Sequence, residues 1–120
     1  MEGQLVHFEL PAQDSGRAKK FWSSLFSWKF REWDGPVEYS MLDGNEPGGA
    51  IYPAEGGAQG PVVYFGTGDI DKSIARVREL GGASGDKQPI PTIGWFARCT
   101  DTEGNDFSLF QNDESAPAPG

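Results

Sequence analysis

Residues 6–30 read VHFELPAQDSGRAKKFWSSLFSWKF, and this stretch predicts a strand followed by an amphipathic helix. Its first part alternates, with Val6, Phe8 and Leu10 on one side and mostly polar residues on the other. Such alternation is typical of a strand with one buried face. We expect Pro11 to end the strand, because proline removes a backbone donor. The fold therefore begins with a half-buried strand that leads directly into a helix.

The helix is expected to pack one apolar stripe against the core. Asp14 or Ser15 is expected to cap it, because their side-chain oxygens accept the orphan N–H groups of a first turn. The apolar residues recur at helical spacing and are predicted core residues: Ala18, Phe21, Trp22, Leu25 and Phe26. The polar residues between them are expected to face water: Arg17, Lys19, Lys20, Ser23 and Ser24.

Three shorter strands are predicted after the helix, over residues 28–33, 37–42 and 50–52, with turn residues between them. Residues 53–61 are rich in glycine and begin and end with proline. This composition indicates a linker, which divides the chain into two halves.

The same order of elements restarts in residues 62–82, which read VVYFGTGDIDKSIARVRELGG. Laid over residues 7–27, this stretch places Asp69 on Asp14, so that strand and helix cap coincide. Asp69 or Asp71 is expected to cap the second helix. We interpret the match as an internal repeat. Gly81 and Gly82 are expected to end the second helix, whose apolar stripe is Ile70, Ile74, Val77 and Leu80.

The remaining strands are predicted over residues 84–88, 95–100 and 106–111. Residues 89–94 contain two prolines, and we expect an unpaired loop there. Residues 112–120 contain two prolines and close with glycine, and they are expected to form a disordered tail.

The composition fits a single domain of 120 residues with its own hydrophobic core. The formal net charge of −8 argues against a nucleic acid or an anionic membrane surface as a partner. No stretch approaches the ~20 apolar residues of a membrane span. The only cysteine, Cys99, excludes an internal disulfide and fits a reducing compartment. We therefore expect a soluble, cytoplasmic protein.

The sequence resembles the vicinal oxygen chelate superfamily, which contains glyoxalase I, bleomycin-resistance proteins and extradiol dioxygenases. Residues 6–30, 62–82 and 99–111 carry the resemblance, and with the strands between them they cover nearly the whole chain. The last stretch, CTDTEGNDFSLFQ, is similar to the family's Asp-Pro-Asp-Gly-Asn turn, with Thr102 at the place of the proline.

The resemblance implies an α+β domain of two βαβββ modules. Their strands would form a curved mixed sheet around a concave pocket, with the helices on the convex face. On this basis we expect one glyoxalase/bleomycin-resistance-like domain over residues 1–111, with modules at about 4–53 and about 61–111. A flexible tail would follow at 112–120. Proteins of this superfamily often form twofold dimers, so a homodimer is expected.

Enzymes of the superfamily hold one divalent metal through His, Glu or Gln side chains of both modules. A metal of this kind needs three or four N or O donors and an open position for the substrate. His7 matches the ligand position of the first module, but Val62 and Ser108 stand where the second module would supply its donors. In the fourth position only Tyr52 has a donor atom. We therefore expect no metal and no cofactor.

Several residues are candidates for contacting a small organic ligand in the implied pocket. His7 titrates near neutrality, and His7 or Glu9 is a candidate general base, the alternative being a hydrogen-bonded structural role. Arg98 would bind a carboxylate or phosphate if it, and not Trp95, faces the pocket. The predicted ligand-binding residues are His7, Tyr52, Tyr64, Arg98 and Ser108, and the candidate catalytic residues are His7 and Glu9.

The resemblance and the candidate site residues together suggest three alternative functions. The first is a small-molecule-binding protein of the glyoxalase/bleomycin-resistance type that lacks the family metal site. The second is a metal-free lyase or isomerase that uses His7 or Glu9 as a proton shuttle. A third, a metal-dependent glyoxalase or dioxygenase, requires a ligand set that the sequence does not contain.

Overall fold

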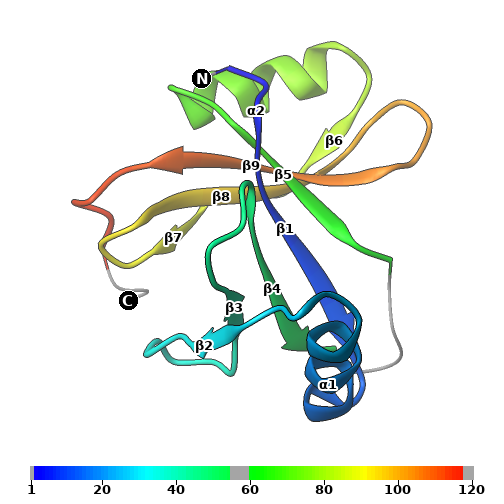
Figure 1. The fold of residues 1–120 in the computed structure, drawn as a ribbon. Helices are drawn as coiled ribbons and strands as arrows, with labels where there is room; N and C mark the ends of the chain where they lie inside the picture. The colour runs from blue at the N-terminus through cyan, green and yellow to red at the C-terminus, as the bar shows by residue number, and fades with distance from the viewer. Residues whose placement is uncertain (1, 55–59, 118–120) are drawn as a thin grey trace. The chain divides into compact units, whose positions relative to one another are not determined.

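The computed structural model describes residues 2–54 and 60–117, and the chain divides into two compact units (Figure 1). The N-terminal unit is residues 7–62. The C-terminal unit is residues 63–120 together with residues 1–6. Each unit has one helix packed against a sheet that contains both parallel and antiparallel pairs. The predicted α+β class and the repeated strand–helix–strands order are therefore confirmed.

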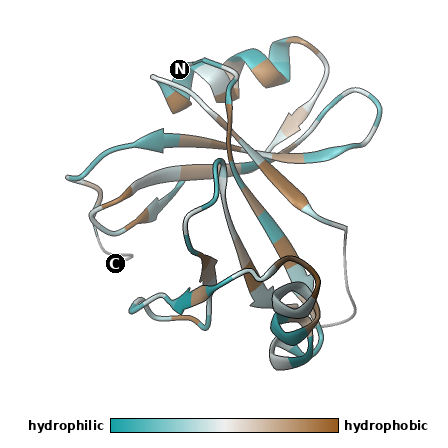
Figure 2. Cartoon of the chain, in the orientation of Figure 1, coloured by the Kyte–Doolittle hydropathy of each residue, from teal (hydrophilic) through white to brown (hydrophobic). Residues whose placement is uncertain are grey.

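The elements of the N-terminal unit are β1 (Leu5–Ala12), α1 (Ser15–Phe26), β2 (Phe30–Glu32), β3 (Ser40–Leu42) and β4 (Gly48–Pro53). The strands lie in the order β2, β3, β4, β1, and α1 packs against β4. β1 and β4 are parallel, whereas β3 is antiparallel to both of its neighbours. Figure 2 shows hydrophobic and hydrophilic bands alternating along β1, as predicted for a half-buried strand.

The prediction that Pro11 ends the first strand is wrong. β1 continues through Pro11, which pairs with Tyr52, to Ala12. The N–H groups of a strand point alternately to its two sides, so one proline removes one donor and leaves the other pairings in place. The chain then turns into α1, where Asp14 accepts a hydrogen bond from Arg17 N at 3.0 Å as the predicted cap.

The predicted buried face of α1 is wrong at three of its five residues. The sequence predicts Phe21, Leu25 and Phe26 in the core, but these side chains are 59%, 55% and 57% exposed. No residue of the helix is fully buried. The half-buried positions also recur at helical spacing, but on a neighbouring face: Ser15, Ala18, Lys19, Trp22 and Ser23.

Contacts with the segment after the helix explain this rotation. Lys19 Nζ lies 3.3 Å from Glu32 Oε2, and Ser23 Oγ donates to the Trp28 carbonyl at 2.8 Å. Trp22 stacks on Trp28 with the ring centroids 4.9 Å apart. Lys19 and Ser23 therefore lie on the packed face of α1, because each has a polar partner in the segment after the helix.

The elements of the C-terminal unit are β5 (Val62–Gly66), α2 (Ile70–Glu79), β6 (Ala83–Ser84), β7 (Gln88–Ile90), β8 (Gly94–Thr100) and β9 (Asp106–Asn112). The strands lie in the order β5, β9, β8, β6, and β7 also pairs with β8. The N-terminal segment joins this unit, because Gly66 N donates to the Gln4 carbonyl and Gly3 N donates to the Gly66 carbonyl, each at 2.9 Å.

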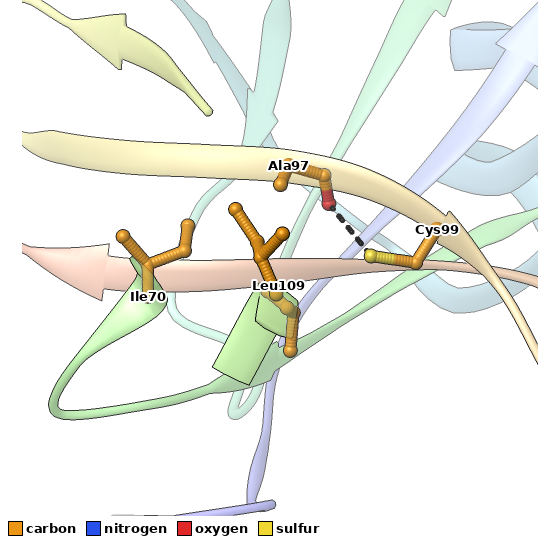
Figure 3. Close-up of a cluster of buried hydrophobic side chains, with 5 residues drawn as sticks. Ile70, Ala97, Cys99 and Leu109 are labelled. Carbon is orange, nitrogen blue, oxygen red and sulfur yellow. Dashed lines mark hydrogen bonds between the residues drawn. The ribbon is translucent and has the colours of Figure 1, made fainter. Parts of the chain in front are cut away.

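The core of the C-terminal unit lies between α2 and the strands β8 and β9 (Figure 3). Its buried members are Ile70, Ile74, Ala97, Cys99 and Leu109. Val77 packs against this core, whereas Leu80 follows the last turn and is 60% exposed. Three of the four predicted stripe residues thus pack as expected. Asp69 caps α2 as predicted, and Gly81 ends the helix with a φ of 95° that suits glycine.

The prediction of an unpaired proline-rich loop after residue 88 is wrong in its first part. β7 includes Pro89, which pairs with Trp95 of β8 in antiparallel register. In the part of the chain that the structure describes, β7 pairs with β8 alone. A proline is tolerated on such an edge, because the donor it lacks is not needed on the open side.

The turn between β8 and β9 is organised by Asp101. Its Oδ1 accepts hydrogen bonds from Glu103 N at 2.8 Å and Asn105 N at 2.9 Å, and its Oδ2 accepts from Asn105 Nδ2 at 3.0 Å. These bonds, chiefly that from the Asn105 side chain, lower the pKa of Asp101. Gly104 has a φ of 83°. The turn therefore forms with Thr102 in place of a proline.

The segment predicted as a flexible tail begins inside the C-terminal unit. Trp95 Nε1 donates to Asp113 Oδ2 at 3.0 Å, and Thr92 N donates to the Ala116 carbonyl at 3.1 Å. Ala116 is buried. Residues 118–120, like residues 55–59 of the predicted linker, lie outside the described residues. Neither described helix is long and apolar enough to span a bilayer.

Candidate functional site

β1 presents His7 and Glu9 on the side of the sheet away from α1. The side that α1 covers carries Glu32, which pairs with Lys19 of the helix. The strand register extends this side across β3 and β4 to Leu10 of β1. Adjacent residues of a strand point in opposite directions, so His7 and Glu9 project from the other side, as the sequence predicts.

Tyr39, which immediately precedes β3, joins His7 and Glu9 on that side. Tyr39 Oη lies 2.6 Å from His7 Nε2, and the same hydroxyl donates to Glu9 Oε2 at 2.8 Å. The imidazole and phenol rings stack, with centroids 6.1 Å apart and an interplanar angle of 21°. Glu9 is only 7% exposed. We call these residues the His7–Tyr39–Glu9 cluster.

Burial determines how His7 titrates. Removal of the imidazolium from water lowers the pKa of His7 below its ordinary value, and the Glu9 carboxylate opposes this effect without cancelling it. The neutral ring is therefore favoured near neutral pH. In a neutral imidazole one nitrogen donates and the other accepts, so His7 can take a proton or a hydrogen bond from a ligand.

The surroundings of the cluster combine a glycine on the neighbouring strand with aromatic side chains. Gly48 pairs with His7 in the register of β1 and β4, and a Cβ added at Gly48 would lie 3.7 Å from His7 Nδ1. Tyr52 lies further along β4 on the same side of the sheet. Trp33 packs edge-on against Tyr39, with ring centroids 5.9 Å apart. Three aromatic side chains thus belong to the region of this acid and base.

In the C-terminal unit, the register places Arg98, Ser108 and Tyr64 on one side of the sheet. Ser108 pairs with Tyr64 on β5 and with Arg98 on β8. Their neighbours Ala97 and Leu109 point the other way, into the core beneath α2. Of the two candidates on this strand, Arg98 therefore faces away from α2, while Trp95 packs against the core.

Ser108 is fully buried between its two neighbours in the sheet. Its Oγ makes no hydrogen bond within the described part of the chain. A buried hydroxyl of this kind costs stability, typically about 1–3 kcal/mol, unless water or another molecule satisfies it. Tyr64 is buried beside it, and Arg98 is exposed. This face therefore combines a cation, a phenol and an unsatisfied hydroxyl.

The sequence-predicted residues thus fall into two groups, one in each unit. His7, Glu9 and Tyr52 lie on one side of the N-terminal sheet, and Tyr64, Arg98 and Ser108 lie on one side of the C-terminal sheet. Sequence reasoning missed Tyr39, which bridges the two candidate catalytic residues. Its position in a predicted strand with Ser40 and Leu42 on the helix side gave a signal, because strand alternation then puts Tyr39 on the side of His7.

Within residues 2–54 and 60–117, no group of three or more His, Cys, Asp or Glu side chains is placed to hold a metal ion. His7 Nε2, the family ligand position, is in contact with the Tyr39 hydroxyl. Ser108 stands at the position of the final carboxylate. This donor set does not match the three or four donors that the superfamily's metal requires.

A separate shallow depression of about 430 Å³ surrounds the start of α1. It is lined by residues of the β1–α1 turn and by Arg17, Ala18, Phe21 and Trp22. None of the residues of the His7–Tyr39–Glu9 cluster lines this depression.

The sequence matches the family model of the glyoxalase-like domain over residues 6–110. A glyoxylase-like domain-containing protein of Didymella fabae is 31% identical over 120 residues, which covers 91% of this chain and 94% of the relative. The match therefore extends over both units.

Solved structures share the fold at low sequence identity. A hypothetical protein from Bacillus halodurans C-125 aligns with a TM-score of 0.77 and 14% identity, over 98% of this chain and 100% of that chain. Methylmalonyl-CoA epimerase in complex with methylmalonyl-CoA and NH4+ aligns with a TM-score of 0.71 and 13% identity, over 98% and 100%. The Mycobacterium tuberculosis methylmalonyl-CoA epimerase aligns with a TM-score of 0.68 and 16% identity, over 98% of this chain and 89% of that chain. The chain therefore belongs to the glyoxalase-like domain family, within the vicinal oxygen chelate superfamily.

Proposed function

We propose that this protein binds a small organic molecule, with the His7–Tyr39–Glu9 cluster as its polar anchor. The observation that carries the proposal is a buried acid, Glu9, that Tyr39 connects to a half-buried base, His7, on the side of the sheet that α1 does not cover. Burying ionisable groups costs free energy, and such groups gather at functional sites more often than in plain cores. Binding is therefore the role that best accounts for the cluster.

The other predicted residues suit a planar or partly apolar ligand with an anionic group. Tyr52 adds aromatic surface with a polar tip on the side of His7. Tyr64, Arg98 and Ser108 are proposed as further ligand-binding residues, with Arg98 binding a carboxylate or phosphate. In this proposal the protein resembles bleomycin-resistance proteins, which bind a molecule without transforming it.

We also propose that binding requires no divalent metal. His7 is the single histidine of the chain, and its Nε2 contacts Tyr39. Among the described residues, no third His, Cys, Asp or Glu side chain joins His7 and Glu9 in a group that could hold a metal, whereas the superfamily's metal sites use three or four donors. The polar contact to the ligand would then be made by His7 itself.

A metal-free lyase or isomerase is the second candidate. Tyr39 links Glu9 to His7 through hydrogen bonds of 2.8 Å and 2.6 Å, an arrangement able to accept and return a proton. Solved structures of this fold include methylmalonyl-CoA epimerases bound to methylmalonyl-CoA and to 2-nitronate-propionyl-CoA. In this alternative His7 or Glu9 would move a proton next to a carbonyl group.

A thermal-shift screen of aromatic, carboxylic and carbonyl compounds tests the binding proposal. We expect at least one compound to raise the melting temperature, and His7→Ala to weaken its binding about tenfold, as the loss of one hydrogen bond predicts. Tryptophan fluorescence or calorimetry measures the affinity. Incubation of the bound compound in deuterated water separates binder from enzyme, because proton transfer exchanges a carbon-bound hydrogen.

The matched control for the screen is Lys20→Ala, which removes an exposed side chain of α1 on the far side of the sheet. This variant should bind as the wild type does. A screen without any shift, or equal affinity of the wild type and His7→Ala, would rule the proposal out.

We propose in addition that the protein is a cytoplasmic homodimer. Phe21, Leu25 and Phe26 expose an apolar strip on α1, which a second copy of the chain would cover. The single cysteine, Cys99, is buried, in keeping with a compartment in which disulfides do not form.

A further inference from the structure

The depression at the start of α1 is a concave surface of the N-terminal unit with a volume of about 430 Å³. Sites for small organic molecules typically measure about 300–1,000 Å³ and are lined mainly by apolar groups. Apolar side chains line most of this depression as well: Pro11, Ala12, Ala18, Phe21 and Trp22. Its size and lining are therefore those of a small-molecule site.

Two perpendicular aromatic rings belong to the lining of the depression. Phe21 and Trp22 pack edge-on, with ring centroids 5.2 Å apart and an interplanar angle of 89°. Trp22 also stacks on Trp28, whereas the Phe21 side chain is 59% exposed. A flat molecule that stacks on one of these two rings presents its edge to the face of the other, and both contacts are favourable for aromatic groups. The lining therefore suits a planar, apolar body.

The charge around the depression favours an anion. Residues 15–31 contain five of the ten cationic side chains of the protein and none of its 18 acidic side chains. Such a basic stretch in a chain with a net charge of −8 creates a local positive field that attracts anions. Among these cations Arg17 lines the depression and is exposed. A guanidinium binds a carboxylate or phosphate through two parallel hydrogen bonds.

Asp14 also lines the depression, and its position determines where the anion lies. Asp14 Oδ1 accepts a hydrogen bond from Arg17 N at 3.0 Å, and the Asp14 carbonyl accepts one from Ala18 N at 3.0 Å. These first-turn amides are therefore bonded to the helix cap, which leaves the Arg17 guanidinium as the group that binds an anion. The Asp14 carboxylate repels an anion from its own end of the depression.

We propose that this depression binds an amphipathic organic anion, whose flat apolar body lies against Phe21 and Trp22 and whose acidic group binds Arg17. The site is separate from the polar anchor of the proposed function, because no residue of the His7–Tyr39–Glu9 cluster lines it. Phe21 also belongs to the strip that a second copy would cover in the proposed homodimer. The ligand and the second copy therefore compete for Phe21, and the single chain is the form that binds.

Two dyes with the same pair of ring systems test the proposal by fluorescence titration of the full chain at concentrations where it is monomeric. Anilinonaphthalene sulfonate carries an anionic group, and phenylnaphthylamine lacks it. We expect Arg17→Gln to weaken binding of the sulfonate about twofold to fivefold, as an exposed ion pair predicts, and to leave binding of the neutral dye unchanged. Phe21→Ala should weaken binding of both dyes, because it removes one of the two rings.

The matched control is Lys20→Gln, which removes the same charge from an exposed position of α1 that does not line the depression. It should bind both dyes as the wild type does. His7→Ala should also retain the Arg17-dependent binding. If His7→Ala does not fold, the comparison of Arg17→Gln with Lys20→Gln still decides, because both side chains are exposed and neither change removes a buried group.

Equal affinity of the sulfonate for the wild type and Arg17→Gln would overturn the inference, as would equal losses in Arg17→Gln and Lys20→Gln. A chain that remains a dimer on dilution and binds neither dye would assign the depression to the second copy, with the same result. Dye binding that is lost only in His7→Ala removes the inference and leaves the proposed function. Dye binding through Arg17 in a protein whose His7 contacts no compound of the screen removes the proposed function and leaves the inference.

Discussion

The hydroxyl of Tyr39 lies 2.6 Å from Nε2 of His7, although the two residues are 32 positions apart in the chain. The sheet order explains their meeting. β3 and β1 are the two neighbours of β4, and Gly48 and Ala50 leave little side chain between them on the side that carries the cluster. A tyrosine just before β3 can therefore reach across a strand of small residues to β1.

Tyr39→Phe should lower the free energy of unfolding by about 1–3 kcal/mol, because it removes a hydrogen bond to a buried carboxylate. Urea denaturation of the two proteins measures the difference. Tyr52→Phe, also a loss of one hydroxyl on the same side of the sheet, is the control and should change stability by less. Equal losses in the two variants would indicate that the hydroxyl of Tyr39 has no special role.

Stability should decrease on acidification because of His7. Burial places its folded pKa below the ordinary value of 6.5, so the unfolded chain binds more protons in the interval between the two values. This contribution is fully present above pH 6.5 and is lost as the pH falls through the folded pKa. Each unit of difference corresponds to about 1.4 kcal/mol.

Urea unfolding at a series of pH values from about 7.5 to about 5 measures this dependence. In His7→Gln, whose side-chain amide does not titrate, the corresponding part of the slope should be absent. An identical slope in both proteins would show that another group is responsible.

Side-chain truncations on α1 and α2 should lower the free energy of unfolding by different amounts. Leu25 is 55% exposed in the single chain, so Leu25→Ala should cost less than about 1 kcal/mol at protein concentrations where the chain is monomeric, whereas Ile74 is buried and Ile74→Ala should cost about 2–5 kcal/mol. Denaturant midpoints of the two variants provide the comparison. A larger loss at Leu25 would mean that this side chain is covered in solution.

Purified protein without a tag should contain no stoichiometric divalent metal after dialysis. The reason is the donor set, in which Val62 and Ser108 occupy the positions where further ligands would be needed. Elemental analysis makes the measurement, and added zinc should leave the tryptophan fluorescence unchanged. About one bound metal ion per chain would contradict the proposal of metal-free binding.

Light scattering should give about twice the mass of the chain if α1 forms a homodimer interface. Phe21→Glu should then yield the monomer, because it places a charge in the exposed apolar strip. Lys20→Glu, a charge change at a neighbouring exposed position, serves as the control and should leave the mass unchanged. A wild-type protein with the mass of one chain would exclude the dimer.

The fold was predictable where the pattern of the sequence and its local contacts agree. Side-chain chemistry narrowed each helix cap to two residues, of which Asp14 and Asp69 are the observed caps. The stripe of α2 was predicted correctly at Ile70 and Ile74 because both face the core directly. α1 was misread because its packed face includes Lys19, whose partner Glu32 lies beyond the helix. A hydrophobic pattern contains no information about such a partner.

The candidate site was predictable in part for a similar reason. Alternation alone placed His7 and Glu9 on the side away from the helix, and it could have placed Tyr39 there as well. What alternation does not give is distance, and the bridge through the Tyr39 hydroxyl depends on the register of β1 with β4. That register is set by pairing between segments far apart in the chain.

The residues of β1 are divided between the two units. Residues 1–6 group with the C-terminal unit, and residue 7 begins the N-terminal unit. The backbone of Gln4 and Gly3 holds Gly66 at the end of β5. A fragment cut at the sequence repeat, from about residue 61 onward, would therefore lack part of its own sheet. To produce the C-terminal unit alone, residues 1–6 would have to be fused after residue 120, as in a circular permutant.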